Sequence, residues 1–481
     1  MRLAKNVTLA SGEFLHIPST DKTMKKNTST PFFTRDPLFY KSFFKMMLVV
    51  AFQNLVAYSV NMLDNIMLGS YSQTALSGAA TVNQIFFVVS QLAIAIGNSL
   101  VVMSSQYWGK KDTDKIRRAT AIAVFYTAVA SAIVFILCTV LNSRLLGIFT
   151  SDQEIIREGT IYLGILKWTF VFYLFSSLFI AMLRSVEIVR ISFVISVISL
   201  IINGTINYTL IFGKFDFPEM GIRGAAIGTL VARTVELLIV IFYVAKADKK
   251  IRFFEKNPFA DFKLKGSMTG EFLKISTPAV ISKLAWSIST PVQTALLGYL
   301  SADAIAANSV ATTFFQYLKV TVVAIASSSA VMIGKSIGEG NEEKVKAEAR
   351  TLSVIDLCVG CLLGFLLFMF RGQLLSYYNL TEQAKIYADH FMIIMSLIMV
   401  TMSYQMPVST GILEGGGDVK FHMYLNIISV WVIVIPLSFL AVFVWNLPAE
   451  WIVIIVQSDQ IFKCLPIFIR FRSYKWIHKI S

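Results

Sequence analysis

The sequence predicts an all-α polytopic membrane protein, with twelve transmembrane helices in two pseudo-symmetric six-helix lobes. Of its 481 residues, 56% are hydrophobic and only 15% are charged, whereas soluble domains carry about 25% charged residues. The hydrophobic residues stand in long runs, and a bilayer-spanning helix needs about 20 of them. The two halves of the chain also repeat. These observations exclude a soluble enzyme, a disordered chain and a secreted disulfide scaffold.

Twelve apolar runs, separated by charged residues or by glycine and proline, give the predicted spans. They cover residues 43–68, 75–105, 119–142, 159–183, 188–212, 224–246, 272–298, 305–334, 351–370, 385–412, 420–445 and 449–469. The longest internal hydrophilic stretch lies between the sixth and seventh runs. We therefore expect a cytoplasmic N-terminal tail at 1–40, an N-terminal lobe at 41–246, a cytoplasmic linker at 247–270, and a C-terminal lobe at 271–481 ending in a short basic tail.

Positive charge is unevenly distributed between the two sides of this arrangement. With the N-terminus inside, about 32 of the 43 lysines and arginines fall on the cytoplasmic side, as the positive-inside rule requires. We therefore expect a multi-pass protein of the plasma membrane with both termini in the cytoplasm. Because the net charge of +14 resides in membrane loops, no nucleic-acid partner is expected, and a monomer in the lipid bilayer is the simplest assembly.

The internal repeat fixes the relation between the lobes. Gly69 aligns with Gly298 and Gly109 with Gly338, both at a separation of 229 residues. Six helices separate the copies, an even number, so both copies cross the membrane in the same sense. A parallel repeat of this kind, related by an axis along the membrane normal, is typical of alternating-access transporters with a cleft between two bundles.

Asp64 is the strongest candidate for a functional residue. It lies late in the first predicted span, three residues after Asn61, and charged residues inside spans are costly and functional by default. A buried carboxylate can either take up a proton or hold a metal cation. The alternative is an aspartate wetted at the outer boundary of the membrane. The repeat places Gln293 at the equivalent position, so the second half lacks this carboxylate.

Further polar residues in the first half point to the same site. Asn203 and Asn207 are four residues apart and share one helix face. Their amides offer oxygens to a cation or N–H groups to a carboxylate, although such residues also hold membrane helices together. In the span 224–246, Arg233 and Glu236 are three residues apart and are predicted to form a local ion pair.

No arrangement of residues suggests catalysis or nucleotide hydrolysis. None of the four histidines has a triad-like or metal-ligand neighbourhood, and no GxxxxGK[ST] loop is present. The protein is therefore expected not to be an enzyme and to need no cofactor. An ion gradient is the remaining energy source, since one charge crossing about 100 mV yields about 2.3 kcal/mol. The coupling ion would be H⁺ or Na⁺.

Several segments resemble the multidrug and toxic compound extrusion (MATE) family of bacteria and archaea. They are Asp64-Asn-Ile-Met-Leu-Gly69, Ala75-Leu-Ser-Gly78, Ser105-Gln-Tyr-Trp-Gly109, Leu183-Arg-Ser185, Asn203 with Asn207, Gly221-Ile-Arg-Gly-Ala-Ala-Ile-Gly-Thr229, and Gly415-Gly-Gly-Asp418. Their order, spacing and twofold repetition cover nearly the whole chain beyond the N-terminal tail. The resemblance implies the two-lobed MATE fold and antiport of drugs against H⁺ or Na⁺.

The resemblance also implies roles for single residues. Asp64 matches the aspartate that binds the coupling ion in the N-terminal lobe, and Asn203 matches a partner asparagine. Asn207 stands where members carry Asp or Asn, and Thr229 resembles a threonine near that site. If the ion is Na⁺, its ligands would be Asp64, Asn203 and Asn207. Some branches carry acidic residues in the seventh and tenth helices, whereas this chain has none around Lys283 and Gln405. A cation site in the C-terminal lobe is therefore not expected.

These features together predict a secondary-active exporter that exchanges organic, largely cationic and amphipathic compounds for H⁺ or Na⁺. One alternative is a flippase for lipid-linked oligosaccharides or lipids, whose pyrophosphate would need cationic partners such as Lys167, Lys283 and Lys319. Another is a channel, which would dissipate a gradient rather than use one. The asymmetric placement of Asp64 in one of two repeats favours the exporter.

Overall fold

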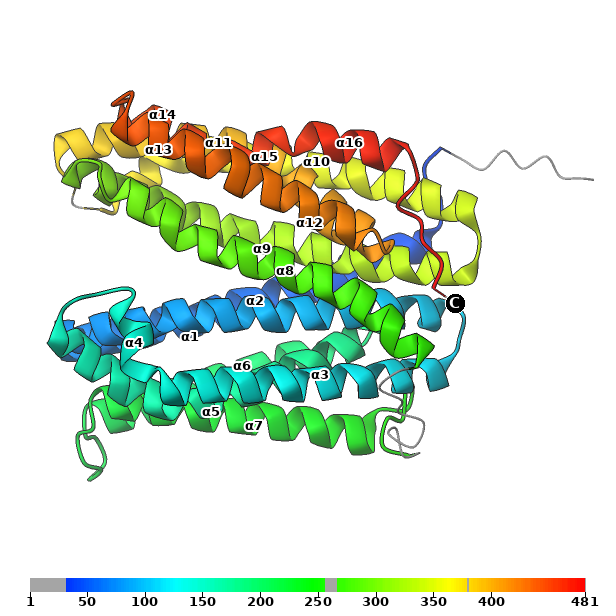
Figure 1. The fold of residues 1–481 in the computed structure, drawn as a ribbon, viewed down its shortest axis with the longest axis horizontal. Coiled ribbons are helices and arrows are strands. Elements are labelled where there is room, and N and C mark those ends of the chain that lie inside the picture. Colours follow the sequence, from blue (N-terminus) through cyan, green and yellow to red (C-terminus); the bar gives the residue numbers. More distant parts are fainter. Residues whose placement is uncertain (1–31, 256–265, 379, 481) are drawn as a thin grey trace, which may run out of the picture.

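The computed structural model describes residues 32–255, 266–378 and 380–480, and within these ranges the chain is helical and contains no strand. Most of the predicted N-terminal tail and the middle of the predicted linker lie outside the described residues. The helices run roughly side by side along the long axis of the molecule (Figure 1). The all-α fold class predicted from the sequence is confirmed.

The first half of the chain supplies six long helices and one short one. They are α1 (Pro37–Tyr71), α2 (Gln73–Gly109), α3 (Thr113–Val140), the short α4 (Asn142–Gly147), α5 (Gln153–Ser185), α6 (Arg190–Ile211) and α7 (Ile222–Phe242), which continues as the π-helical segment η1 (Tyr243–Ala247). Side chains at their starts accept the first free N–H groups, as Ser72 does from Ala75 and Asp152 does from Glu154. Such caps satisfy donors that have no partner inside a helix.

The second half repeats this plan with more interruptions. It comprises α8 (Ser267–Leu297), α9 (Ala302–Glu339), α10 (Glu342–Ser376), α11 (Glu382–Met406) with η2 (Pro407–Leu413), α12 (Val419–Ile427) with η3 (Ile428–Val434) and α13 (Ile435–Phe443), and finally α14 (Ala449–Gln457), α15 (Asp459–Phe462) and α16 (Cys464–Arg472). Counting each continuous rod once, the second half also contains six membrane-length segments. All twelve predicted spans therefore correspond to helices.

Eleven of these segments are long and apolar enough to cross a membrane, counted over the described residues. The twelfth is α8, which has 31 residues but contains Pro278, Pro291 and several polar residues. α8 is less apolar than the other long helices. This agrees with its position, because it lies between the two groups of helices (Figure 1). The observed helices extend beyond the predicted runs, because helices project past the bilayer and end in polar turns that hydropathy does not mark.

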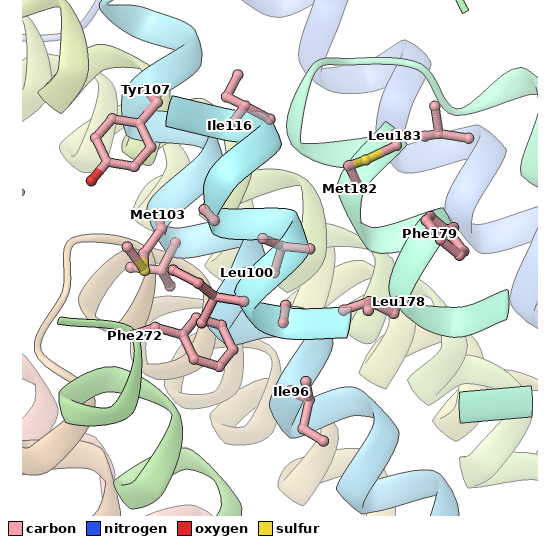
Figure 2. Close-up of a cluster of buried hydrophobic side chains, with 14 of the residues drawn as sticks. Ile96, Leu100, Met103, Tyr107, Ile116, Leu178, Phe179, Met182, Leu183 and Phe272 are labelled. Atoms are coloured by element: carbon pink, nitrogen blue, oxygen red, sulfur yellow. The ribbon is translucent and has the colours of Figure 1, made fainter. Parts of the chain in front are cut away.

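Figure 1 shows the helices of the first half on one side of the molecule and α9 to α16 on the other. A large hydrophobic cluster packs α2, α3 and α5 together, with Leu100, Met103, Ile116 and Met182 at its centre (Figure 2). Phe272, near the start of α8, is fully buried in the same cluster. The first turns of the second half are therefore anchored on the helices of the first.

The two halves meet where α2 crosses α9. A side chain on Gly109 would collide with the backbone of α9 at Lys335 and Gly338, and one on Gly338 would collide with Gln106. Gly109 and Gly338 are equivalent positions in the repeat. Their mutual contact therefore places the pseudo-twofold axis between α2 and α9, and only glycine permits so close an approach.

The C-terminal segment 473–480 lies across this crossing (Figure 1). The amide of Gln106 in α2 donates to the carbonyl of His478 at 3.0 Å and accepts from the backbone N–H of Ile480 at 2.9 Å. His478 N–H donates to the carbonyl of Gly416, after η2, at 2.9 Å. Trp476 is fully buried beside Gly416. The segment therefore bridges the two halves at this end of the molecule.

Candidate functional site

Four polar residues from three helices form a continuous hydrogen-bonded chain in the first half. Asp64 on α1 is only 7% exposed. The amide nitrogen of Asn207 donates to Asp64 Oδ1 at 2.5 Å and to Asn203 Oδ1 at 3.3 Å. Asn203 in turn donates to Thr229 Oγ1 on α7 at 3.2 Å. The carboxylate thus sits at the end of a chain of neutral groups.

The local sequence makes this arrangement possible. Asn203 and Asn207 are one turn apart on α6 and are both buried, which directs their side chains toward the same neighbours. Gly228 of α7 faces Asn207, and a side chain there would collide with Asn207 Oδ1. That oxygen is buried and has no hydrogen-bond partner. An unpartnered acceptor beside a carboxylate is suited to a cation.

A buried ion pair lies close to these residues. Arg233 and Glu236 on α7 are joined by a 2.7 Å contact, as predicted from their spacing. Ser176 of α5 donates to Glu236 at 2.8 Å, and the guanidinium lies 5.0 Å from the centre of the Tyr173 ring. The charge of Arg233 also acts on Asp64. Because Arg233 is already paired with Glu236, Asp64 is left as a buried carboxylate with no direct ion-pair partner among the described residues.

The structure does not join the other two predicted site residues to this chain. Asn61 is one turn before Asp64 on α1 but is exposed. Gln293 on α8 is half-buried, and neither residue forms a hydrogen bond with the four side chains within the described structure. Asp64, Asn203, Asn207 and Thr229 are therefore brought together, whereas Asn61 and Gln293 are not.

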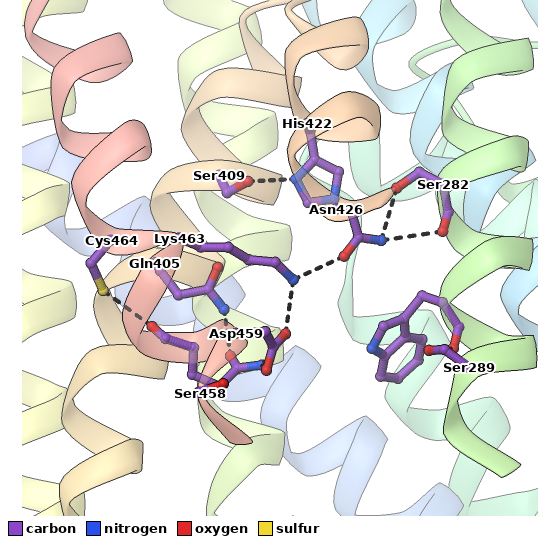
Figure 3. A network of polar contacts seen from close by, with 12 residues as sticks. Ser282, Ser289, Gln405, Ser409, His422, Asn426, Ser458, Asp459, Lys463 and Cys464 are labelled. Atoms are coloured by element: carbon purple, nitrogen blue, oxygen red, sulfur yellow. Dashed lines mark hydrogen bonds and ion pairs between the residues drawn. The ribbon is translucent and has the colours of Figure 1, made fainter. Parts of the chain in front are cut away.

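A second polar network lies in the interior of the other half (Figure 3). The ammonium of Lys463, which is 5% exposed, donates to Asp459 at 2.8 Å and to Asn426 at 2.9 Å. Asn426 donates to the carbonyl and hydroxyl oxygens of Ser282 on α8, both at 3.2 Å. Gln460 donates to both oxygens of Asp459 at 2.8 Å. The charge of Asp459 is thus compensated inside the protein.

Sequence reasoning alone misses this network. Asp459 and Lys463 are four residues apart within the predicted span 449–469, and this spacing is the signal that identifies them as a buried pair. The segments around Lys283 and Gln405 supply no carboxylate, as expected. Glu414 is buried near η2, with its Oε1 3.4 Å from Nε2 of His422. Asp459 therefore has a direct ion-pair partner in Lys463, whereas Asp64 has none among the described residues.

Comparison of the sequence with known proteins identifies the family of this chain. The family model MatE matches residues 50–209 and 278–440, one segment in each half. The probable multidrug resistance protein NorM of Thermotoga maritima is 26% identical over 444 residues, which cover 92% of this chain and 94% of that protein. The probable multidrug resistance protein YoeA of Bacillus subtilis is 21% identical over 365 residues, covering 76% and 78% of the two chains.

Solved structures show the same fold. A mutant of the Vibrio cholerae MATE transporter VcmN superposes with a TM-score of 0.82 at 18% identity, covering 92% of this chain and 98% of that one. A MOP superfamily transporter from Pyrococcus furiosus, whose binding pocket is described as having reverse polarity, superposes with a TM-score of 0.79 at 15% identity, covering 90% and 95%. The matched segments, the twelve-helix fold and the two repeated halves all agree, and the chain belongs to the MatE family of membrane transporters.

Proposed function

We propose that the protein is a secondary-active multidrug exporter of the plasma membrane, which exchanges organic, largely cationic compounds for H⁺ or Na⁺. The observation that carries this proposal is the neutral environment of the buried Asp64 carboxylate. Asp64 accepts a hydrogen bond from Asn207, which is connected through Asn203 to Thr229, and all three residues are neutral. The names of the relatives, which are probable multidrug resistance proteins, support export of several different compounds.

Asp64 can couple movement of the ion to movement of the drug, because a buried carboxylate that stays charged without a partner costs free energy. H⁺ would neutralise it directly. Na⁺ would be held by carboxylate and amide oxygens, and the free Oδ1 of Asn207 is one such oxygen. In either case the amide of Asn207 must reorganise when the ion binds. Since Asp64 lies on α1, ion binding would alter the packing of α1 and release the drug.

The end at which the two halves are bridged supports an orientation for the proposed cycle. Both Gly109 and segment 473–480 lie at the end that carries most of the basic loops, which the positive-inside rule assigns to the cytoplasm. Both termini would then be cytoplasmic, and the structure would be closed toward the cytoplasm. In the proposed cycle this state takes up the ion from outside, and the ion-loaded protein opens inward to discharge it. A monomer contains both lobes that such a cycle requires.

The proposal is tested with purified protein in liposomes loaded with ethidium. A pH gradient and a Na⁺ gradient are imposed separately, and ethidium movement is followed by fluorescence. Uphill movement driven by one gradient identifies the ion. The Asp64→Asn substitution keeps the shape of the side chain and removes its charge, so it is expected to abolish uphill movement. Asp389→Asn, which alters an aspartate paired with Arg371 on another helix, serves as the matched control.

Two results would contradict the proposal. Full uphill transport by the Asp64→Asn variant would remove Asp64 from the coupling step. No gradient-driven movement by the unmodified protein would favour the flippase alternative, and translocation of a fluorescent lipid-linked sugar would then be measured in the same liposomes.

A further inference from the structure

Two lysines in the membrane interior of the second half have no ionic partner. Lys283 on α8 and Lys319 on α9 form no hydrogen bond or ion pair in the part of the chain that the structure describes, and both are half-buried. The third lysine of this region, Lys463, is paired with Asp459 at 2.8 Å. An ammonium without a direct ion pair inside a membrane protein is costly and marks a substrate or ion pathway by default.

Trp286 of α8 is the aromatic neighbour of Lys319 and lies one helical turn from Lys283. The ammonium of Lys319 lies 5.3 Å from the centre of the Trp286 ring. Lys283 is three residues before Trp286 on α8, so both side chains lie on one side of that helix. Trp286 in turn contacts Phe87 of α2, with ring centres 5.6 Å apart. Since α2 belongs to the first half, this group stands at the boundary between the lobes, where alternating access would expose it.

Neither nearby acidic group forms an ion pair with Lys283 or Lys319 in the described residues. Asp459 accepts hydrogen bonds from Lys463 and from Gln460, and Glu414 lies 3.4 Å from His422. A ligand that enters between the lobes would therefore meet two ammonium groups and the indole ring of Trp286. This combination suits a flat aromatic compound that carries a carboxylate, because ammonium groups attract the carboxylate while the indole ring packs against the aromatic part.

We propose that Lys283, Lys319 and Trp286 form an anion subsite that binds the carboxylate of an aromatic substrate. This proposal rests on the exporter function proposed above and narrows its substrate class. Asp64 in the first half takes the coupling ion, whereas the second half offers two ammonium groups to an anionic group of the substrate. The preferred substrates are therefore zwitterionic aromatic compounds rather than simple cations.

Rhodamine 110 and rhodamine 123 provide a matched pair of probes, because the second is the methyl ester of the first. Binding to the purified full-length protein is measured by fluorescence polarisation, which does not require transport. The unmodified protein should bind rhodamine 110 more tightly than its ester. Substituting both lysines (Lys283→Gln with Lys319→Gln) should weaken binding of rhodamine 110 by about tenfold or more and leave rhodamine 123 within about twofold.

Three controls separate this effect from a loss of structure. Lys167→Gln alters another membrane lysine, which lies over the ring of Phe135, and should leave both dyes unaffected. The double Lys→Arg variant keeps the charges and should retain the preference for the acid. Thermal unfolding in detergent verifies that each variant is folded, and Lys319→Gln alone replaces the double variant if the latter is unstable.

The binding measurements distinguish failure of the anion subsite from failure of the exporter function. Equal affinity of the unmodified protein for acid and ester, or an equal loss of both dyes in the lysine variants, would overturn the anion subsite. Displacement of rhodamine 110 by phosphatidylglycerol vesicles, together with no gradient-driven movement of the dye, would assign the lysines to lipid instead and would also overturn it. If ethidium is moved uphill while rhodamine 110 is not bound, the exporter function stands and only the subsite fails.

Discussion

The chemistry of the first half depends on where a single amide can lie. Asn207 donates to Asp64 and to Asn203 through the same nitrogen, and its oxygen faces Gly228 without a partner. The repeat-equivalent positions of Asn203 and Asn207 are Ile433 and Leu437. The second half therefore cannot reproduce this arrangement, although its backbone repeats the first.

The first prediction concerns the space beside Asn207. Gly228→Ala places a methyl group against Asn207 Oδ1 and should displace the amide from Asp64. A hydrogen bond to a charged group contributes about 1.5–3 kcal/mol, so gradient-driven ethidium transport should fall by about tenfold or more. Gly164→Ala is the matched control, because a side chain at Gly164 meets open space. Unchanged transport by Gly228→Ala would show that the amide position does not matter.

Sequence and structure agree unevenly at this scale. The positions of Asp64, Asn203 and Asn207 could be inferred because a polar group in an apolar span is conspicuous. Gln293 was inferred from the repeat, yet it stays apart from the chain around Asp64. Equivalent positions in a parallel repeat are related by an axis along the membrane normal, so they meet only where they lie beside that axis, as Gly109 and Gly338 do.

Prolines affect the helices of the second half in different ways. Pro407 begins the π-helical segment η2, where the regular hydrogen-bond ladder changes, because proline has no N–H to donate. Pro278 and Pro291 lie inside α8, which continues through both. Neighbouring helices compensate for lost hydrogen bonds in membrane proteins. The sequence shows where each proline lies but does not predict which of them changes the helix type, because this depends on how neighbouring helices pack.

The second prediction concerns the contact between α10 and α11. Gly360 and Gly364 are four residues apart on α10, and added side chains would lie 2.5 Å from Ser403 Cβ and from the carbonyl oxygen of Ser396, respectively. Gly364→Val should therefore force the two helices apart and destabilise the protein by about 1–3 kcal/mol. Gly372→Val, on the same helix but facing open space, should cost much less.

Thermal unfolding of the two variants in detergent measures this difference. Both substitutions introduce the same β-branched residue, so their shared effect on helix propensity cancels in the comparison. Equal melting temperatures for Gly364→Val and Gly372→Val would contradict the proposed role of the close helix contact.

At the scale of the whole molecule, the closed end couples the two halves. Segment 473–480 binds Gln106 in the first half and the carbonyl of Gly416 in the second. An ion pair between Glu187 and Lys335, with 2.7 Å between Oε1 and Nζ, joins the halves at a separate point. Opening toward this side requires all of these contacts to separate. These contacts add to the hydrophobic packing of α1 and α2 against α9.

The third prediction concerns Trp476, the largest fully buried side chain of this segment. Trp476→Ala should loosen the segment and favour opening on this side, since truncation of a buried tryptophan costs about 3–5 kcal/mol. A cysteine introduced at Ser105, which is fully buried and faces Gly334, reports the opening. Its labelling by a hydrophilic maleimide should become about tenfold faster or more.

The labelling experiment uses a background in which the four native cysteines are replaced. Trp445→Ala is the control, because Trp445 is half-exposed and follows α13, away from segment 473–480. Identical labelling rates in the Trp476→Ala and Trp445→Ala variants would show that the segment does not hold the halves together.

The sequence by itself determined the helical membrane fold, its twelve spans, the repeat and the isolated carboxylate of Asp64. These features follow from local composition and periodicity, because a bilayer forces apolar helices and makes each buried charge visible. Tertiary structure alone decided which residues meet: Asn207 with Asp64, Lys463 with Asn426, and Lys319 with Trp286. Such contacts depend on how helices distant in sequence rotate and cross, and on the glycines that allow them to approach, which no local pattern specifies.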